Sequence, residues 1–519
     1  MNSIIDTLFF TPPSRFSCIM KFYRVLCLLL LSLKTHVHAQ TEFQQLTASY
    51  QPISGYLAGS GIVTASTVPE SSEWNPENEG ASAPGINLGN PHIAMADAYS
   101  NVYVAEKSNH SILKITPDGL AHTFAGTHVY PYTGPAPSYA PPAGFTTDTP
   151  GPATSINLVA CNGLYVLPNG IVYIYDAGNH RIRRVGLDGI MTTIVNDPDP
   201  NWLPSGRGLW VSPTEDLIYY TQEVADLNAP IPADSINHPP LGGVVKKWTP
   251  TGGIQSITAY PASPTAATLE LINPGNIDVH PLTHKLYVTD RAEADLTLTK
   301  SCVYRIDTES PNPLTTSSTK TRTAGTYNIP VAAPVDGAPA ASTYLNQVRG
   351  ISFTPEGGYF LCTHKGGQVW YVDTDPVTPR IHLFLNGRGR NDIKYNGPNA
   401  LTLPVTTAEC HSQPRAVSVS PDGSLLIVSN DSGLVRKIKD IALPQLPPID
   451  LVERITPATF HLAFNSTPGH SYIIQRSTTL APGSWQDDAV ISPATSPANF
   501  SETIAPGSPQ GFYRLAAPR

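Results

Sequence analysis

The stretch "DAGNHRIRRVGLDGIMTTIV", residues 176–195, holds an acid, an Asn-His pair and three arginines, followed by apolar residues. A second stretch, "EKSNHSILKITPDGLAHTFAG" at residues 106–126, has the same order of residue types. In both, apolar segments flank an Asp-Gly pair, which is a favoured β-hairpin turn. The repeated pattern therefore predicts two antiparallel strands around a tight turn rather than a reactive cluster.

Two more apolar segments precede each copy, so the repeated unit has four strands. The nearer segments are "NVYVA" and "IVYIY", and the farther ones are "HIAMAD" and "GLYVLP". Weaker copies follow, and the matching second-strand positions of all six copies are Tyr103, Tyr173, Tyr219, Tyr287, Phe360 and Leu426. Six four-stranded units predict a six-bladed β-propeller, whose radial arrangement protects the sheet edges. The sixth copy lacks its outer strand, and we expect "PISGYLAG" at residues 52–59 to supply it.

These residues resemble the NHL repeat, named for an Asn-His-Leu triplet, which here reads Asn109-His110 and Asn179-His180 with Ile two residues after each His. The resemblance covers residues 45–442. The last four copies lack Asn-His and also fit generic six-bladed propellers of the lactonase-like type. The resemblance implies an all-β propeller domain. We interpret His110 and His180 as residues that hydrogen-bond within their own blade turns, without a catalytic role.

The N-terminal region resembles an export signal. In "MKFYRVLCLLLLSLKTHVHAQ", basic residues precede a short apolar run, and small residues occupy the positions that a signal peptidase reads. We predict a signal peptide over residues 1–39, with Met20 as an alternative start of translation. The apolar run is too short to span a bilayer. The sequence therefore predicts a secreted or periplasmic protein whose mature chain is not inserted into a membrane.

Composition favours strands and turns. The 519 residues include 52 Pro and 39 Gly, and we find no convincing amphipathic helix after residue 40. Beyond residue 39 the chain has 28 basic and 39 acidic residues. An acidic chain repels polyanions, so nucleic acid is excluded as a partner. Four cysteines remain after cleavage of the signal peptide: Cys161, Cys302, Cys362 and Cys410. Their spacing is not that of a metal site, and they are compatible with either disulfides or buried free thiols.

The candidate site lies where the innermost strands begin, because propeller ligands generally bind at the mouth of the central channel. Each of the six copies has a polar residue there: His92, Asn162, Arg207, Asn276, Arg349 and Arg415. Together they predict a donor-rich, positive ring suited to a carboxylate or another anion. The alternative is that the arginines support neighbouring loops or pair with acids of adjacent blades.

Two classes of function are compatible with this pattern. The first is an exported binding or scaffold protein that recognises a protein, a glycan or a small anionic ligand at the channel mouth. The alternative is a metal-dependent, lactonase-like hydrolase or lyase, with a divalent metal near His92 or His411. No ligand set of a known metalloenzyme matches residue by residue, so no metal ligands and no catalytic residues are assigned, and the cofactor is unknown.

The C-terminal region has a different pattern. A Pro-rich linker is predicted at residues 443–457. Alternating segments such as "TFHLAF" and "YIIQRS" then predict a small antiparallel β-sandwich over residues 458–519, with Trp485 in its core. This region looks like the fibronectin-III-like accessory modules that end some exported bacterial proteins. The resemblance implies an adhesive, spacer or sorting role and no activity.

Overall fold

The computed structural model describes residues 42–53, 55–61, 74–129, 145–230, 239–265, 269–291, 301–306, 320–326, 335–387, 401–407, 413–439, 449–456, 459–464, 472–477, 486–491, 498–503 and 512–516. The predicted signal peptide, Cys410, His411 and Trp485 lie outside these ranges. The described chain is all-β in character, as expected from its composition.

Eight antiparallel sheets contain most of the described strands. The first sheet has the order β1 (Ala81–Ser82), β5 (Leu120–Ala125), β4 (Ser111–Ile115), β3 (Val102–Glu106), β2 (Pro91–Ala96). The second has β6 (Gly151–Pro152), β10 (Ile190–Asn196), β9 (Arg181–Val185), β8 (Val172–Asp176), β7 (Cys161–Val166). The third has β11 (Trp202–Leu203), β13 (Ile218–Ala225), β14 (Pro240–Thr249), β15 (Gly253–Ser256), and β12 (Leu209–Val211) also pairs with β13.

The next three sheets continue the series. The fourth has β16 (Pro274–Val279), β17 (Leu286–Asp290), β18 (Cys302–Ile306), β19 (Lys320–Ala324). The fifth has β20 (Ala338–Pro339), β24 (Arg380–Leu385), β23 (Gln368–Val372), β22 (Tyr359–Thr363), β21 (Val348–Phe353). The sixth has β25 (Pro414–Val419), β26 (Leu425–Ser429), β27 (Leu434–Ile438). Short 3-10 helices occur at Pro76–Asn78, Ala153–Ser155, Ala177–Asn179, Ala340–Ser342 and Asn430–Ser432.

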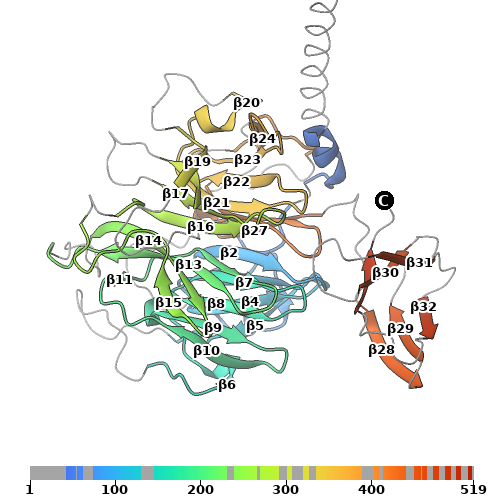
Figure 1. Cartoon of the computed structure of the whole chain (residues 1–519). Coiled ribbons are helices and arrows are strands. Elements are labelled where there is room, and N and C mark those ends of the chain that lie inside the picture. The colour runs from blue at the N-terminus through green and yellow to red at the C-terminus, as the bar shows by residue number, and fades with distance from the viewer. Residues whose placement is uncertain are drawn as a thin grey trace, which may run out of the picture.

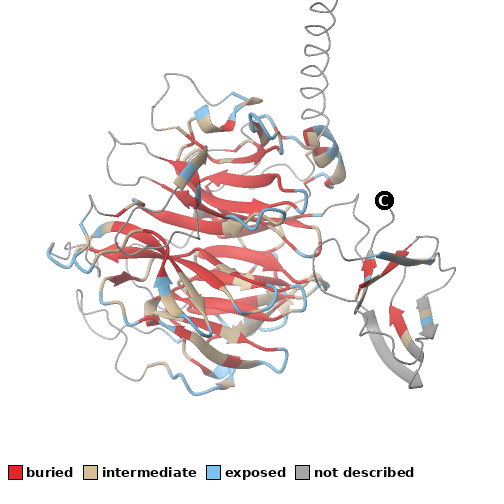
Figure 2. Cartoon of the chain, viewed as in Figure 1, coloured by how far each residue is buried: buried red, intermediate tan, exposed pale blue. Residues whose placement is uncertain are grey.

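The six sheets are arranged so that one strand of each, its innermost strand, lies toward the middle (Figure 1). The innermost strands contact one another in the order β2, β7, β12, β16, β21, β25 and then β2 again, so the contacts form a closed ring. Apolar residues predominate in second strands such as β3, β8 and β17 because both faces of these strands are covered, and every residue of the three is buried (Figure 2). The core therefore lies between the sheets, where Val104, Leu164 and Leu426 belong to one cluster.

Residues 55–59 lie against β27, the last strand of the sixth sheet. The Leu57 amide donates to the Val435 carbonyl oxygen (2.7 Å), and the Val435 amide donates to the Ala58 carbonyl oxygen (3.0 Å). At Gly59 (φ +104°) a β-carbon would overlap the Gly433 carbonyl oxygen, so only glycine fits there. Chain segments from near both ends of the ring region thus meet at one sheet.

Residues 42–49 are helical, although the sequence after residue 40 shows no convincing amphipathic helix. The helix packs by its aromatic residue: the Phe43 ring stacks on His382, with 4.7 Å between ring centroids. A Glu42 carboxylate oxygen accepts from the Tyr371 hydroxyl (2.6 Å). Eight residues with few apolar side chains carry a weak periodic signal, and these contacts with the fifth sheet provide the stabilisation that the local sequence lacks.

Two further sheets lie in the C-terminal region, drawn in orange and red in Figure 1. One has the order β28 (Ile449–Thr456), β29 (Thr459–Phe464), β32 (Ala498–Thr503), and the other β31 (Gln486–Ile491), β30 (Tyr472–Ser477), β33 (Phe512–Ala516). Leu462 and Phe464 of the first share a buried cluster with Ile474 of the second. The predicted linker at residues 443–457 differs from the structure, because β28 occupies most of it and pairs with β29.

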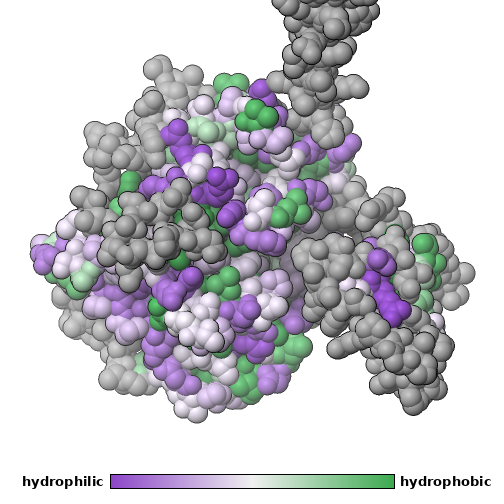
Figure 3. All heavy atoms as spheres, in the orientation of Figure 1, coloured by the Kyte–Doolittle hydropathy of each residue, from purple (hydrophilic) through white to green (hydrophobic). Residues whose placement is uncertain are grey.

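The surface shows no single apolar face in the view of Figure 3, where hydrophobic residues are scattered among hydrophilic ones. Among the described residues, no helix has the length and apolar character needed to cross a membrane.

Candidate functional site

The repeated stretches at residues 106–126 and 176–195 have a structural role. Asp176, at the end of β8, is fully buried, and its carboxylate accepts from the Val159 amide (2.8 Å), from Asn179 Nδ2 (2.8 Å) and from Arg183 Nε (3.1 Å). Glu106 at the end of β3 accepts in the same way from the Gly89 amide (2.8 Å). These carboxylates hold the loops that lead into the innermost strands, so the acid of the repeat is used for architecture.

The histidines of the repeat act between sheets, which corrects the expectation that they bond within their own turns. The Ala160 amide of the second sheet donates to His110 Nδ1 of the first (3.0 Å). His180 of the second sheet stacks on Trp202 of the third, with 5.1 Å between ring centroids. Burial lowers the pKa of His110 to about 3, with nearby Lys107 and His128 contributing. A neutral imidazole is the form that accepts the amide hydrogen.

The six predicted site residues all lie at the starts of innermost strands. Arg415 is half-buried, and the other five are buried: His92, Asn162, Arg207, Asn276 and Arg349. Because the strands are antiparallel, each second strand ends at the rim where its inner strand begins, as in the pairing of Pro91 with Glu106. Residues that follow the second strands therefore join the same rim.

His92 and Arg415 contact each other directly. His92 Nδ1 lies 2.9 Å from the Asn90 carbonyl oxygen, so Nδ1 carries the proton and Nε2 accepts from Arg415 Nη2 at 2.9 Å. Burial lowers the pKa of His92 well below its ordinary value, and the charges of Arg415 and Lys107 lower it further. His92 is therefore a neutral partner that orients the Arg415 guanidinium.

Glu223, in β13, lies between two arginines. Its Oε1 is 3.6 Å from Arg207 Nη2 and 3.7 Å from Arg291 Nη2. Burial is the largest influence and raises the pKa of Glu223, but Arg207, Arg291, the Ser205 hydroxyl and Arg349 together outweigh it and hold the pKa below its ordinary value. Arg291 follows β17 and also donates from Nε to Asn273 Oδ1 at 2.8 Å. The carboxylate thus bridges the third and fourth sheets.

The positively charged side chains at this rim lie close enough to lower one another's pKa values. Burial, with the charges of Arg415 and Arg207 as the next causes, lowers the pKa of Lys107 to about 8. Burial also lowers the pKa of Arg291, with Arg349 and Arg207 as the next contributors. We call Lys107, Arg207, Arg291, Arg349 and Arg415 the cationic cluster. Glu223 is the described carboxylate that acts on Lys107, Arg207 and Arg291 together.

Two of the six predicted residues, Asn162 and Asn276, are uncharged and do not take part in these pKa shifts. Asn162 donates from Nδ2 to the Pro204 carbonyl oxygen (2.8 Å), which places it beside the loop that carries Arg207. Asn276 is buried on β16, and its carbonyl oxygen accepts from the Thr289 hydroxyl (3.2 Å). The structure therefore brings together His92, Arg207, Arg349 and Arg415 of the predicted set, with Asn162 adjacent.

Three residues of the site were missed in the sequence: Lys107, Glu223 and Arg291. Lys107 directly follows β3 and Arg291 directly follows β17, so both lie where a second strand reaches the rim. The antiparallel pairing of the first two strands of each unit is the signal that could have found Lys107 and Arg291, whereas Glu223 lies within β13 and has no such signal.

The alternative hypothesis is a metal-dependent hydrolase or lyase. In the described part of the chain, no three His, Cys, Asp or Glu side chains are grouped so that they could hold a metal ion. Both ring nitrogens of His92 are engaged, one by Asn90 and one by Arg415. His411 lies outside the described residues. The thiols of Cys161, Cys302 and Cys362 are buried and unbridged.

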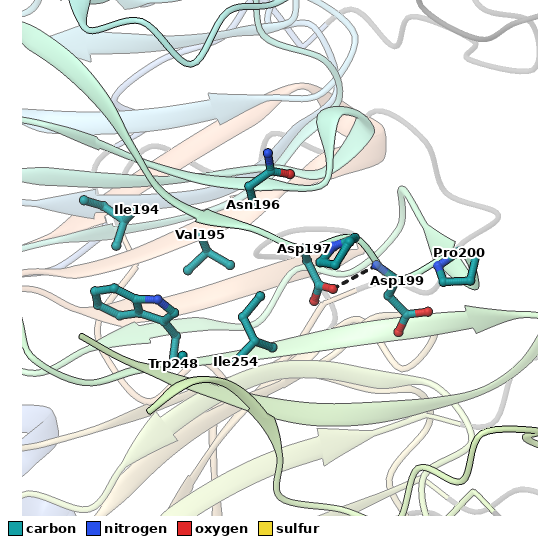
Figure 4. Close-up of a pocket in the computed structure, with 10 residues that line it drawn as sticks. Ile194, Val195, Asn196, Asp197, Asp199, Pro200, Trp248 and Ile254 are labelled. Carbon is teal, nitrogen blue, oxygen red and sulfur yellow. Dashed lines mark hydrogen bonds between the residues drawn. The ribbon is translucent and has the colours of Figure 1, made fainter. Parts of the chain in front are cut away.

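A groove of about 650 Å³, lined by none of the cluster residues, lies between β10 and the β14–β15 hairpin (Figure 4). Its apolar lining includes Ile194, Trp248 and Ile254. Its carboxylates, Asp197 and Asp199, each lie 2.8 Å from the buried Lys246 ammonium group. These acids neutralise a buried cation, so we place the candidate site at the cationic cluster and not in this groove.

No protein-family model matches the chain, and no curated protein matches it. Several solved structures are similar. A gluconolactonase from Xanthomonas campestris is 13% identical, covering 68% of this chain and 87% of its own, with a TM-score of 0.39. An auxiliary nutrient binding protein from Bacteroides ovatus is 14% identical, covering 75% and 76%, with a TM-score of 0.46. Virginiamycin B lyase from Staphylococcus aureus is 14% identical, covering 72% and 91%, with a TM-score of 0.34. At these identities, none of their activities carries over to this chain.

Proposed function

We propose that this protein is an exported binding protein, a six-bladed NHL-like β-propeller that takes a small anionic ligand at its channel mouth. The propeller would span residues 45–442, with residues 55–59 closing the ring and the C-terminal sheets forming a β-sandwich accessory module. The export signal at residues 1–39 would direct it to the periplasm or outside the cell. A protein or glycan partner would bind through its own carboxylate or other anionic group.

The observation that carries this proposal is the cationic cluster. Like charges repel one another in a low-dielectric site, and the pKa values of Lys107 and Arg291 are lowered first by burial and then by the charges of neighbouring arginines. Such an arrangement is unfavourable for stability alone, and an anion that binds among the cations relieves it. Arginine forks also match carboxylate and phosphate oxygens geometrically.

The experiment is a thermal-shift and calorimetric titration of the full mature chain with acetate, lactate, gluconate and inorganic phosphate, at constant ionic strength. A bound anion raises the melting temperature by mass action. We expect Arg415→Met to weaken binding at least ~10-fold, because one charge-assisted contact is lost. Arg305→Met, which removes an exposed arginine of β18, is the matched control and should bind as the unchanged protein does. If no carboxylate or phosphate binds, the proposed function is wrong.

A further inference from the structure

Three side chains of the rim have polar atoms for which the described protein supplies no hydrogen bond. Two of them are buried atoms, Asn162 Oδ1 and Arg207 Nη1, and the third is the ammonium group of the half-buried Lys107, for which the described residues offer charge interactions and no hydrogen bond. Asn162 is 1% exposed and Arg207 is 4% exposed. Leaving the buried Asn162 Oδ1 and Arg207 Nη1 unpaired is costly, so each calls for a polar partner from outside the protein, either water or a polar group of a ligand.

The three side chains come from consecutive sheets of the ring. Lys107 follows β3 at the rim where β2 begins, Asn162 is in β7, and Arg207 precedes β12. Inner strands β2, β7 and β12 are neighbours. Gly163 leaves no room for a β-carbon against the Arg207 carbonyl oxygen, so the strand that carries Asn162 packs tightly against the Arg207 segment. Asn162 thus lies between two cations that are within electrostatic reach of each other.

The chemistry of this trio is specific. Lysine and arginine only donate, so they take an anionic oxygen. The Asn162 amide is oriented by its bond from Nδ2 to the Pro204 carbonyl oxygen, so Oδ1 is the atom left to accept. An acceptor between two cations disfavours a ligand ammonium group and suits a neutral hydroxyl donor.

Resting on the proposed function, we propose that the ligand is a hydroxy acid, whose carboxylate binds Lys107 and Arg207 and whose hydroxyl donates to Asn162 Oδ1. A sugar acid and a simple 2-hydroxy acid share this chemistry. A binding site with a buried acceptor discriminates strongly against a ligand that lacks the matching donor, because the acceptor then stays unpaired.

The test compares lactate, 2-methoxypropionate and propionate by calorimetry on the unchanged protein, with gluconate to distinguish a sugar acid from a simple 2-hydroxy acid. Methylation keeps the oxygen and removes its donor hydrogen. We expect lactate to bind at least ~10-fold more tightly than either analogue. Asn162→Ala should remove this preference while the affinity for propionate stays. Asn169→Ala, an exposed asparagine in a turn of the same chain region, is the matched control and should keep the preference.

Three outcomes are distinguishable. A hydroxyl preference that depends on Asn162 supports the inference. Equal binding of lactate, 2-methoxypropionate and propionate overturns the inference and leaves the proposed function standing. Failure of all carboxylates and phosphate overturns both. The comparison among ligands on the unchanged protein decides the matter even if Asn162→Ala does not fold.

Discussion

Lys107 is the residue whose charge state links the cluster to pH. Its pKa is lowered to about 8 by burial and by Arg415 and Arg207. Below this value the ammonium group is charged and can bind an anion, and above it the group is neutral. We therefore expect anion affinity to fall as the pH rises through about 8, measured as dissociation constants from pH ~7 to ~9.5.

Two variants separate this effect from general alkaline weakening. Lys107→Arg keeps a charge at every pH in the range, so its affinity should stay flat. Lys107→Met should bind weakly and equally at all pH values. An unchanged pH profile in Lys107→Met would show that another group controls the titration.

His110 is predicted to be a stabilising residue and not a site residue. His110→Ala removes the acceptor of the buried Ala160 amide, so we expect a loss of about 1–3 kcal/mol in the free energy of unfolding. Anion affinity should not change. His122→Ala is the control, since His122 forms an exposed pair with Glu79 and should cost far less. Urea denaturation measures both, and equal losses would refute the interpretation.

Among the elements, the pairing of residues 55–59 with β27 is the one that joins distant parts of the chain. Gly59→Ala forces a methyl group onto the Gly433 carbonyl oxygen, whereas Gly55→Ala, also at positive φ (+73°), meets no atom. We expect Gly59→Ala to lose about 1–3 kcal/mol more than Gly55→Ala, because overpacking adds to backbone strain. Similar losses in chemical denaturation would mean that this pairing does not stabilise the ring.

The strands that could be predicted from sequence are those buried on both faces. Segments such as "IVYIY" and "LLIVS" are apolar and β-branched, and β8 and β26 occupy them. The two-residue edge strands β1, β6 and β20 were not predicted, because two residues have no periodicity. The helix at residues 42–49 was missed for a related reason, since its stability comes from Phe43 packing on His382.

The site was predictable only in part, because one strand per unit was considered. His92, Arg207, Arg349 and Arg415 precede or begin inner strands, and this spacing could be read directly. Glu223 lies within the long strand β13, and its position between Arg207 and Arg291 depends on how the third and fourth sheets meet. That arrangement is tertiary and leaves no local signal.

At the scale of the whole molecule, an acidic chain carries a cationic rim. The formal net charge is −8, yet Lys107, Arg207, Arg291, Arg349 and Arg415 share one region. Low-dielectric walls around such a group strengthen its local field, while the acidic remainder disfavours large polyanions. This distribution favours a small anion over a nucleic acid or another highly charged polymer.

Anion binding within the cationic cluster can be observed directly in crystals. The most direct measurement is anomalous X-ray scattering from crystals soaked in selenate, a doubly charged oxyanion whose selenium atom can be located. We expect an anomalous peak in contact with Lys107 and Arg207 that disappears in Arg415→Met or weakens strongly there. Selenate found only at surface lysines, with the cluster empty at saturating concentration, would show that the cluster does not bind anions.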